Sequence, residues 1–300
     1  MAEFKSGFVA IIGRPNVGKS TFINQVMGEK ISIISSKPQT TRNQIRGIYT
    51  TADEQIIFID TPGIHKPHHQ LGTIMNADAL QALSGVDLIL LLVDATEKFG
   101  AGDAFVISEL QKVKTPVFLI FNKIDLVKDK AALMENVLKF TNAFSFKEVF
   151  YISALNGENI PALLQSIGDN LEAGPLYYPQ DQKSDHPESF IISEIIREKV
   201  LQLTKEEVPH SVAVVVEEMQ EDEEHLLNIR AVIYVERTSQ KKIIIGENGK
   251  MIKQIGTLAR AEIVPLMGRK IYLDLWVKVE EDWRNRNQIL RRFGFSIENK

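Results

Sequence analysis

The sequence contains no cysteine. This absence excludes a disulfide framework, a zinc site built on thiolates and a cysteine nucleophile. It also fits a reducing compartment, and we therefore expect a cytoplasmic protein. The remaining composition is that of ordinary globular proteins, with 44% hydrophobic and 25% charged residues among 300. This length is enough for about two domains of ~150 residues each.

The chain also lacks a net positive charge and long apolar runs. The formal net charge is -4, so the chain as a whole lacks the basic excess typical of nucleic-acid-binding proteins, and basic residues must be sought in local clusters. The apolar run Val86–Val93 has only the length of a strand, and the apolar start of the chain leads directly into a glycine-rich motif. The sequence therefore predicts no membrane anchor, while peripheral contact with a membrane stays open.

Residues 1–173 alternate short β-branched runs with amphipathic helical patterns. This alternation is typical of an α/β fold with a mostly parallel sheet that is covered by helices on both faces. The expected strands are Phe8–Ile12, Gln44–Tyr49, Gln55–Ile59, Asp87–Val93, Val117–Phe121 and Val149–Ile152. The expected helices include Thr21–Met27, Ala131–Phe140 and Ile160–Leu171.

The pattern breaks at residues 174–188, which read GPLYYPQDQKSDHPE. This proline-rich and polar segment has no helical period and predicts a linker between a first domain over residues 1–173 and a second over residues 189–300. The second domain is expected to contain, in order, a helix Ser189–Leu203, strands Val212–Glu218 and Leu226–Val235 around an acidic tip, a helix Lys250–Val264, a strand Lys270–Val279 and a short helix from Trp283.

Residues 13–20 read GRPNVGKS between the first expected strand and the first expected helix. The spacing matches the phosphate-binding pattern G-x-x-x-x-G-K-S/T, in which glycines turn backbone N–H groups toward the phosphates and the helix N-terminus adds its dipole. Lys19 is expected to reach the β- and γ-phosphates, and the Ser20 hydroxyl to bind Mg²⁺. The alternative is a glycine turn that matches by chance, which the strand before it and the helix after it disfavour. The candidate nucleotide-binding residues here are Gly13, Arg14, Pro15, Asn16, Val17, Gly18, Lys19, Ser20 and Thr21.

Two further segments predict the rest of the phosphate site. Residues 60–63 read DTPG at the end of an expected strand, where Asp60 is placed to hold Mg²⁺ and Gly63 lets the backbone approach the γ-phosphate. In the segment PQTTR, residues 38–42, a threonine hydroxyl can reach the metal when the γ-phosphate is present; Thr41 is the first candidate and Thr40 the second. The candidate catalytic residues are therefore Lys19, Thr41, Asp60 and Gly63, and the candidate metal ligands are Ser20, Thr41 and Asp60.

Residues 122–125 read NKID at the end of the expected strand Val117–Phe121. Asp125 can accept two hydrogen bonds from guanine that adenine does not offer, and sites of this kind reject analogues by ~10⁴-fold or more. Asn122 is expected to brace the loop and to contact the edge of the base, and the stem of Lys123 to lie against the face of the base. Residues 153–155 read SAL, so that Ser153 and Ala154 complete the candidate base site with a backbone N–H for the guanine oxygen. In this order the motifs predict a site for GTP or GDP with Mg²⁺ rather than a dinucleotide site, since no GxGxxG follows Ile12.

The position that follows DTPG is unusual for catalysis. Many GTPases orient the attacking water with a glutamine there, whereas this chain has Ile64, which cannot polarise water. We therefore expect slow intrinsic turnover that depends on Mg²⁺, the phosphate loop and a monovalent cation or a partner. Asn16 is the candidate K⁺ ligand, with a loop-capping asparagine as the alternative. The cluster His65–His69 is interpreted as a loop rather than a metal site.

Residues 246–249 read GENG and open a helix. Such a G-x-x-G turn resembles that of the KH module, which clamps about four nucleotides of single-stranded RNA. The residues Ile243–Ile245, Ile252 and Ile255 are expected to form an apolar floor for bases. The order helix–strand–strand–helix–helix–strand predicts an α/β KH domain of type II, and the helical spacing after the turn disfavours the alternative of an Asn-Gly hairpin. The candidate RNA-binding residues are Gly246, Glu247, Asn248, Gly249, Lys250 and Lys253.

Nearly the whole chain resembles the Era family of bacterial GTPases. The resemblance rests on the segments GRPNVGKS, QTTR, DTPG, NKID and ISA, followed by GENG in a C-terminal KH domain. It implies GTP hydrolysis, binding to the 3′ end of the small-subunit (16S) ribosomal RNA and to pre-30S and 30S particles, and a role in 30S assembly. It also implies a weak peripheral association with the inner face of the plasma membrane, and we expect a monomer.

Three functions compete at this stage. The first is a switch in which GTP changes how the KH domain is presented to RNA. The second is an enzyme that modifies RNA at the expense of GTP, but residues 181–300 show no second catalytic cluster. The third is an RNA-binding protein with a vestigial nucleotide pocket, which the intact Lys19, Ser20, Asp60 and Asp125 disfavour.

Overall fold

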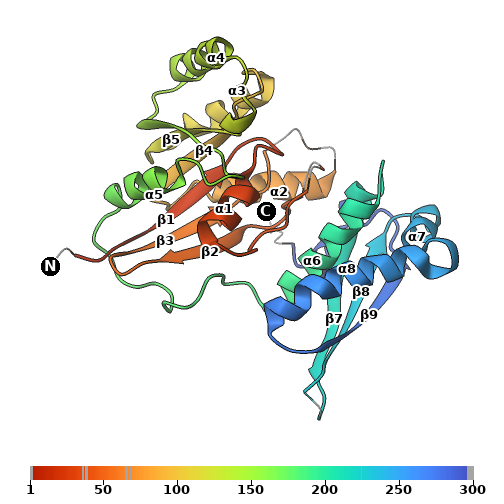
Figure 1. The fold of residues 1–300 in the computed structure, drawn as a ribbon. Coiled ribbons are helices and arrows are strands. Elements are labelled where there is room, and N and C mark those ends of the chain that lie inside the picture. The colour runs from red at the N-terminus through yellow and green to blue at the C-terminus, as the bar shows by residue number, and fades with distance from the viewer. Residues whose placement is uncertain are drawn as a thin grey trace. The chain divides into compact units, whose positions relative to one another are not determined.

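The computed structural model describes residues 3–35, 37, 40–64, 67, 69–223 and 225–295. The chain divides into two compact units (Figure 1). The first unit comprises Met1–Ser32, Thr41–Pro67 and Met75–Asp185, and the second comprises Ile33–Thr40, His68–Ile74 and His186–Lys300. The second unit thus includes two short segments, Ile33–Thr40 and His68–Ile74, that come from the part of the sequence expected to form the first domain.

A six-stranded sheet forms the centre of the first unit, with the strand order β2-β3-β1-β4-β5-β6. All neighbouring strands are parallel except β2, which runs antiparallel to β3. This confirms the mostly parallel sheet expected from the sequence. The strands are β1 (Lys5–Ile12), β2 (Ile45–Thr50), β3 (Glu54–Asp60), β4 (Leu88–Asp94), β5 (Val117–Asn122) and β6 (Glu148–Tyr151).

Helices cover both faces of this sheet because successive residues of its strands point to opposite sides. In β1, Val9 and Ile11 join one core with α1 (Lys19–Met27) and α5 (Ile160–Asp169). Ala10 and Ile12 join the other core with α2 (Gln70–Gln81), α3 (Ala101–Leu110) and α4 (Lys130–Ala143). A central strand that is buried on both faces explains the continuous apolar run of Leu88–Val93, each at most 4% exposed.

The segment expected to be a linker is held on the first unit as far as Asp185. The side chain of Gln55 accepts hydrogen bonds from the backbone N–H groups of Tyr177 and Tyr178. Further along, the N–H of Ile48 donates to the carbonyl of Lys183 at 2.9 Å. A polar, proline-rich composition without helical period therefore corresponds here to an extended segment that is bonded to the edge of the sheet rather than to a free tether.

The second unit contains a three-stranded sheet with the order β7-β8-β9, in which β7 and β8 are antiparallel and β8 and β9 parallel. Its core lies between one face of this sheet and the helices α6, α7 and α8. The elements are α6 (Glu188–Leu203), β7 (Ala213–Glu221), β8 (Leu227–Val235), α7 (Thr238–Ile245), α8 (Lys250–Met267) and β9 (Ile271–Val279). This is the order expected for a KH domain of type II.

Two features of this unit differ from the expectation. Strand β7 continues to Glu221, so most of the acidic segment is paired with β8 instead of forming a loop at the tip. The short helix expected from Trp283 begins later, because Trp283–Asn285 form a single 3-10 turn and the helix α9 runs over Asn287–Arg292. The next residue, Phe293, packs on Tyr234 with ring centroids 4.6 Å apart. Among the described helices of both units, none combines the length and the hydropathy needed to cross a membrane.

Candidate nucleotide site and candidate nucleic-acid interface

The motif GRPNVGKS forms the turn between β1 and α1. Its last glycine, Gly18, has a φ of 101°, and a Cβ at this position would lie 2.2 Å from Nδ2 of Asn122. Only glycine fits such a close approach of backbone to side chain. Lys19 opens α1 and its Nζ donates to the carbonyls of Gly13 at 3.3 Å and Arg14 at 3.0 Å. The ammonium group therefore lies within the loop that the motif predicts to enclose phosphates.

Lys19 is 6% exposed. Burial lowers the pKa of Lys19 from 10.5 to about 8, against the opposing attraction of Asp60. A buried ammonium group with carbonyl partners is a poorly compensated charge, and a triphosphate brought into the loop would supply the missing negative charge. The electrostatics of the loop thus favour an anionic ligand.

Three oxygen-bearing side chains converge beside this loop. The hydroxyl of Ser20 lies 2.9 Å from that of Thr41 and donates to Oδ2 of Asp60 at 3.0 Å. The other carboxylate oxygen of Asp60 is buried and has no hydrogen-bond partner among the residues that the structure describes. A buried, unpaired carboxylate oxygen beside two hydroxyls is the type of hard oxygen site that Mg²⁺ prefers. These residues therefore fit the expected metal.

The charge of Asp60 is costly in this position. Burial raises the pKa of this carboxyl above its ordinary value, while attraction to Lys19 and hydrogen bonds from Ser20, Ser32 and the backbone of Thr61 act in the opposite direction. The Ser32 hydroxyl donates to Oδ2 of Asp60 at 3.1 Å. Sequence reasoning missed Ser32, because it stands in no motif and comes near Asp60 only through the fold.

The two threonines of the PQTTR segment have different surroundings. Thr41 faces Ser20, whereas the Thr40 hydroxyl donates to the carbonyl of Lys37 at 2.7 Å. The geometry therefore favours Thr41 as the residue that approaches the metal. Two other residues of the segment, Pro38 and Gln39, lie outside the described part of the chain.

The DTPG segment lies directly against the phosphate loop. A Cβ on Gly63 would lie 2.8 Å from the backbone of Pro15, and the N–H of Ile64 donates to the carbonyl of Gly13 at 3.2 Å. The side chain of Ile64 is 2% exposed, so this residue packs in the core and cannot orient a water molecule. His65, Lys66 and His68 of the histidine cluster lie outside the described residues.

Arg14 has a role that the motif does not predict. Its Nη1 lies 3.2 Å from a carboxylate oxygen of Asp103 and 3.0 Å from one of Glu97. The guanidinium is thus engaged by two carboxylates near the start of α3, and this fixes the outer side of the loop. The backbones of the loop residues Pro15, Asn16 and Val17 and the first turn of α1, with Thr21, remain candidates for contact with a nucleotide.

Asn122 joins the base motif to the phosphate loop. Its Nδ2 donates to the carbonyl of Val17 at 2.8 Å, and the N–H of Ala154 donates to its Oδ1 at 2.9 Å. The expected bracing by Asn122 is therefore present in the geometry. The N–H of Ala154, which the sequence suggested for the guanine oxygen, is occupied by Asn122, and its neighbour Ser153 bonds within its own loop.

The other residues of NKID are placed around this bridge. Lys123 has a φ of 67°, and its Nζ donates to the carbonyl of Asn16 at 2.8 Å and to Asp94 at 2.5 Å. Burial would raise the pKa of Asp94, but the hydrogen bonds from Lys123 and Thr96 hold it below the ordinary value. Asp125 is exposed and so is accessible to a base. Sequence reasoning missed Asp94, which ends β4 at the same edge of the sheet as the motif residues. It could have been found as a polar residue at the carboxyl end of a parallel strand, where ligands bind in such sheets.

The GENG turn connects α7 and α8 in the second unit. Positive φ angles occur at Gly246 (72°), Asn248 (51°) and Gly249 (76°), and a Cβ on Gly249 would meet no atom within 4 Å. The turn therefore bends sharply and leaves the space at Gly249 open, as close contact with a nucleic-acid backbone requires. Lys250 at the start of α8 and Lys253 one turn later are exposed.

The apolar floor expected beside this turn is partly wrong. Ile244 and Ile255 are 0% exposed and belong to the core of the unit, because α7 and α8 place them against the sheet. A hollow of about 340 Å³ lies instead between α8 and β9. Its lining includes Ile252, Lys253, Gly256 and Arg260 of α8 with Tyr272 and Leu275 of β9. We call this hollow the KH groove.

Comparisons with known proteins agree with this arrangement. A family model described as "50S ribosome-binding GTPase" matches residues 8–123, and a model described as "KH domain" matches residues 207–284. The chain is 39% identical to a variant of Aquifex aeolicus Era solved with GDP and aluminium fluoride, and the match covers 98% of this chain and 100% of that chain with a TM-score of 0.94. The chain belongs to the Era family.

A second solved structure extends the comparison. Era in complex with MgGDPNP and nucleotides 1506–1542 of 16S ribosomal RNA is 40% identical over 98% of this chain and 100% of that chain, with a TM-score of 0.94. This Era-family chain is accordingly a GTPase with a P-loop domain followed by a KH domain, which confirms the fold class and the enzymatic activity expected from the motifs.

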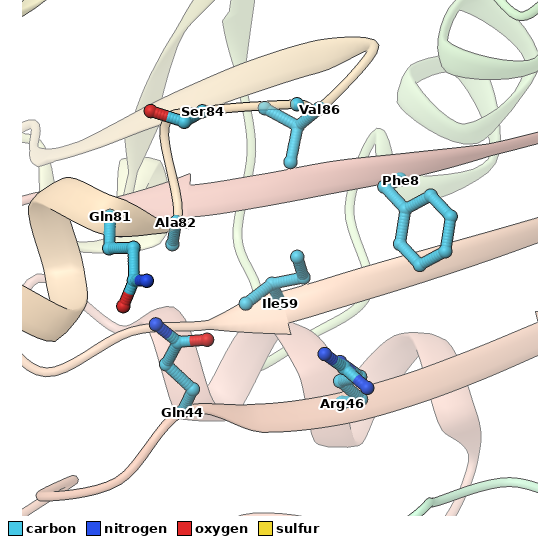
Figure 2. A pocket seen from close by; sticks show the side chains of 9 residues that line it. Phe8, Gln44, Arg46, Ile59, Gln81, Ala82, Ser84 and Val86 are labelled. Atoms are coloured by element: carbon cyan, nitrogen blue, oxygen red, sulfur yellow. The ribbon is translucent and has the colours of Figure 1, made fainter. Parts of the chain in front are cut away.

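A separate hollow of about 400 Å³ lies on the sheet of the first unit (Figure 2). Figure 2 shows the amides of Gln44 and Gln81 pointing toward one another across it. Arg46 at its edge is bonded to Asp185 at 2.9 Å. No motif residue of the Era family lines this hollow, so it is not part of the nucleotide site. Its lining comprises Phe8, Gln44, Arg46, Ile59, Gln81, Ala82, Ser84, Gly85 and Val86.

Proposed function

We propose that this chain is a GTP-controlled RNA-binding switch that acts in the assembly of the 30S ribosomal subunit. It binds GTP or GDP with Mg²⁺ in its first unit and the 3′ end of the 16S ribosomal RNA in its KH groove. The observation that carries the RNA half of this proposal is the open space at Gly249 directly before α8, whose exposed lysines and apolar groove fit a single strand. The relative solved with 16S ribosomal RNA supports the same assignment.

In the nucleotide site we assign the following roles. Lys19 binds the β- and γ-phosphates, and the backbone at Gly63 meets the γ-phosphate. Ser20, Thr41 and Asp60 hold Mg²⁺, which when bound neutralises charge on the phosphate oxygens. Since Ile64 supplies no water-orienting group, intrinsic hydrolysis is slow and depends on this charge neutralisation.

The guanine base is read at the other end of the same site. Asp125 accepts from the ring N–H and the exocyclic amine, and the stem of Lys123 lies against the ring. Asn122 acts through the loops it holds, Val17 on one side and Ala154 on the other. Guanine offers both donors to this carboxylate, whereas adenine leaves it without them in the complex, which is the physical basis of the preference for guanine.

A contact inside the second unit supports coupling between the nucleotide and the KH domain. Arg197 of α6 donates to the carbonyl of Thr40, and Glu198 accepts from the N–H of Ile34 at 3.0 Å. These bonds fix the segment that immediately precedes Thr41. A γ-phosphate that draws Thr41 toward Mg²⁺ therefore acts on a segment bonded to α6, and a ligand shifts such an equilibrium by its differential affinity for the two states.

The test is a titration of a fluorescent RNA that ends in the 16S 3′ sequence, first with a non-hydrolysable GTP analogue and then with GDP. The proposal predicts tighter binding with the GTP analogue. Equal affinity in the two states would contradict the switch, because a ligand without differential affinity shifts nothing. Loss of all binding in both states would contradict the RNA-binding function itself.

A monovalent cation completes the proposed catalytic site. Asn16 lies in the phosphate loop with a φ of 64° and is exposed, and its side-chain oxygen is of the type that K⁺ accepts near the β,γ-bridge. GTP hydrolysis measured in K⁺ and in Na⁺ should be faster in K⁺, and Asn16→Ala should remove this difference. Equal rates in the two salts would refute the cation.

We also propose a cytoplasmic monomer that associates peripherally with the inner face of the plasma membrane and binds pre-30S and 30S particles. The family resemblance supports this proposal. Sedimentation of the protein alone should give a single species of one chain. Fractionation of cells should place most of the protein in the soluble fraction and with small-subunit particles, and a minor part with membranes that is released by salt.

A further inference from the structure

The outer face of the KH sheet, the side opposite α6 and α8, carries two exposed aromatic rings on one strand. Tyr272 and Trp276 of β9 are 58% and 54% exposed, whereas Ile271 and Val277 on the other side of the strand are buried in the core. Large aromatic side chains that remain exposed on a regular strand cost solvation and mark binding surfaces. Neither ring belongs to the motifs that predicted the RNA site.

The position of β9 connects this face with the KH groove. Among the described strands, β9 pairs with β8 alone and so forms an edge of the sheet. Tyr272 therefore lines the KH groove at the edge, together with Arg260 and Leu275, while it also belongs to the outer face. A strand of nucleic acid that fills the groove can pass over this edge onto the outer face without leaving the surface of the protein.

A hydrogen bond to a neighbouring residue of the same strand holds the ring of Trp276 in place. Its indole N–H donates to Oδ2 of Asp274 at 2.7 Å, and the same oxygen accepts from Nε of Arg230 at 3.4 Å. Because Arg230 also pairs with Glu218 at 2.8 Å, its charge is compensated by two carboxylates. These three groups leave one net negative charge beside the ring, so this part of the face suits contact with bases rather than with phosphates.

A third aromatic ring of the outer face is covered. Tyr234 of β8 is covered by Phe293 and by the guanidinium of Arg292, whose centre lies 5.4 Å from the Tyr234 ring. Tyr272 and Trp276 are therefore the exposed aromatic rings of this face among the residues that the structure describes. Tyr272 and Trp276 are four positions apart along the strand, about 13 Å, which leaves room for further bases between the rings, since stacked bases rise by about 3.4 Å.

We infer that Tyr272 and Trp276 form a second base-stacking surface, on which bases of the single-stranded RNA that leaves the KH groove stack against the aromatic rings. The inference rests on the proposed RNA-binding function and extends it to a face that carries no KH motif. Stacking on aromatic side chains is how proteins hold unpaired bases with little dependence on sequence. The surface would lengthen the bound RNA segment beyond the nucleotides clamped at GENG.

The two tryptophans of the chain make a direct experiment possible. Trp276 is 54% exposed and Trp283 is 0% exposed, so that quenching by a stacked base reports on Trp276. We expect single-stranded RNA with the 16S 3′ sequence to quench the tryptophan fluorescence of the full chain, and Trp276→Phe to abolish this quenching while affinity stays within about twofold, because phenylalanine still stacks.

Removal of the Trp276 ring should weaken RNA binding without changing how the affinity depends on salt. Trp276→Ala should lower RNA affinity by roughly tenfold and leave the salt dependence of affinity unchanged, since no phosphate contact is lost. Leu258→Ala on α8 is the matched control, because Leu258 is also apolar and exposed (39%) but does not line the KH groove; its affinity should equal that of the unmodified chain.

The outcomes separate this inference from the function on which it rests. Unquenched fluorescence together with wild-type affinity of Trp276→Ala would overturn the stacking surface, and a protein partner would then be the reason for the exposed rings. If Gly249→Asp still abolished RNA binding in that case, the proposed function would stand. RNA binding that survived in Gly249→Asp would instead contradict the KH groove.

Discussion

The carboxamide of Asn122 joins Val17 of the phosphate loop to Ala154 of the loop after β6, by hydrogen bonds of 2.8 and 2.9 Å. Asn122 is 2% exposed, and both halves of its amide are therefore satisfied by backbone groups. Asn122, at the end of β5, therefore links the phosphate-binding loop to the loop expected at the base. This link explains how three motifs that are far apart in the sequence form one site.

Replacement of this amide should affect both stability and ligand binding. Asn122→Ala leaves a buried carbonyl and a buried N–H unpaired, at about 1–3 kcal/mol each, and releases the two loops from one another. We expect the free energy of unfolding to fall by about 2–6 kcal/mol and the affinity for GDP to fall by at least ~10-fold. Chemical denaturation and nucleotide titration measure the two effects.

The matched control is Asn136→Ala. Asn136 is 5% exposed and makes the same kind of bridge, since it accepts from the N–H of Phe99 and donates to the carbonyl of Glu97. Its loss should cost similar stability with a much smaller loss of nucleotide affinity, because it reaches the phosphate loop only through the pair of Glu97 with Arg14. An equal loss of affinity in both variants would mean that general destabilisation, and not the link between the loops, explains the effect of Asn122.

The sequence predicted those parts of the site that depend on strand ends. Asp60 ends β3 and Asn122 ends β5, and the carboxyl ends of parallel strands meet at one edge of a sheet. The order of helices and strands in the KH domain could be predicted because the spacing of apolar residues differs between helices and strands. What could not be predicted depends on distant pairs, such as the bond from Ser32 to Asp60, or on the burial of one helix side, as for Ile244.

Lys19 should take up a proton when a triphosphate binds at alkaline pH. The depressed pKa of about 8 means that the free folded protein binds fewer protons than the unfolded chain between about pH 8 and 10.5, so in this window Lys19 makes stability rise with pH. Phosphates favour the charged ammonium and raise its pKa again. Affinity for GTP should therefore fall as the pH rises above about 8.

Calorimetry in buffers of different ionisation enthalpy measures this linkage. At pH 8.5 we expect net proton uptake on binding of GTP, and at pH 7 no uptake by Lys19. Lys123→Met serves as the comparison, because Lys123 approaches Asn16 and Asp94 rather than the interior of the phosphate loop and its loss should leave the uptake unchanged. Absence of uptake at pH 8.5 in the unmodified chain would mean that Lys19 is already charged there.

The two hydroxyls of the proposed metal site should respond differently to the nucleotide. Ser20→Ala should weaken Mg²⁺-dependent binding of both GDP and a GTP analogue, because Ser20 bonds directly to Asp60. Thr41→Ala should weaken binding of the GTP analogue alone. Thr40→Ala is the control, since its hydroxyl bonds to the backbone of Lys37. Titrations with and without Mg²⁺ measure these effects. If Thr40→Ala, and not Thr41→Ala, lost affinity for the GTP analogue alone, Thr40 rather than Thr41 would be the metal ligand.

The preference for guanine should depend on one carboxylate. Asp125→Asn replaces an acceptor pair by an amide and should move affinity from GTP toward XTP by a combined factor of ~10³ or more, given the cost of an unpaired polar group on each side. Asp129→Asn is the matched control because Asp129 caps α4 and asparagine caps equally well. Unchanged GTP affinity in Asp125→Asn, measured by competition, would refute the base site.

The GENG turn allows a substitution that changes charge with little change in shape. A Cβ on Gly249 would meet no atom within 4 Å, and the residue has a φ of 76°, which aspartate and asparagine tolerate better than other side chains. Gly249→Asp should lower RNA affinity at least ~10-fold through repulsion of the phosphates, and the loss should shrink at high salt. Gly249→Asn has nearly the same shape without the charge and should retain most of the affinity. Equal losses in the two variants would mean that bulk at the turn, rather than charge beside the RNA backbone, controls binding, whereas full affinity in both would place the RNA elsewhere on the domain.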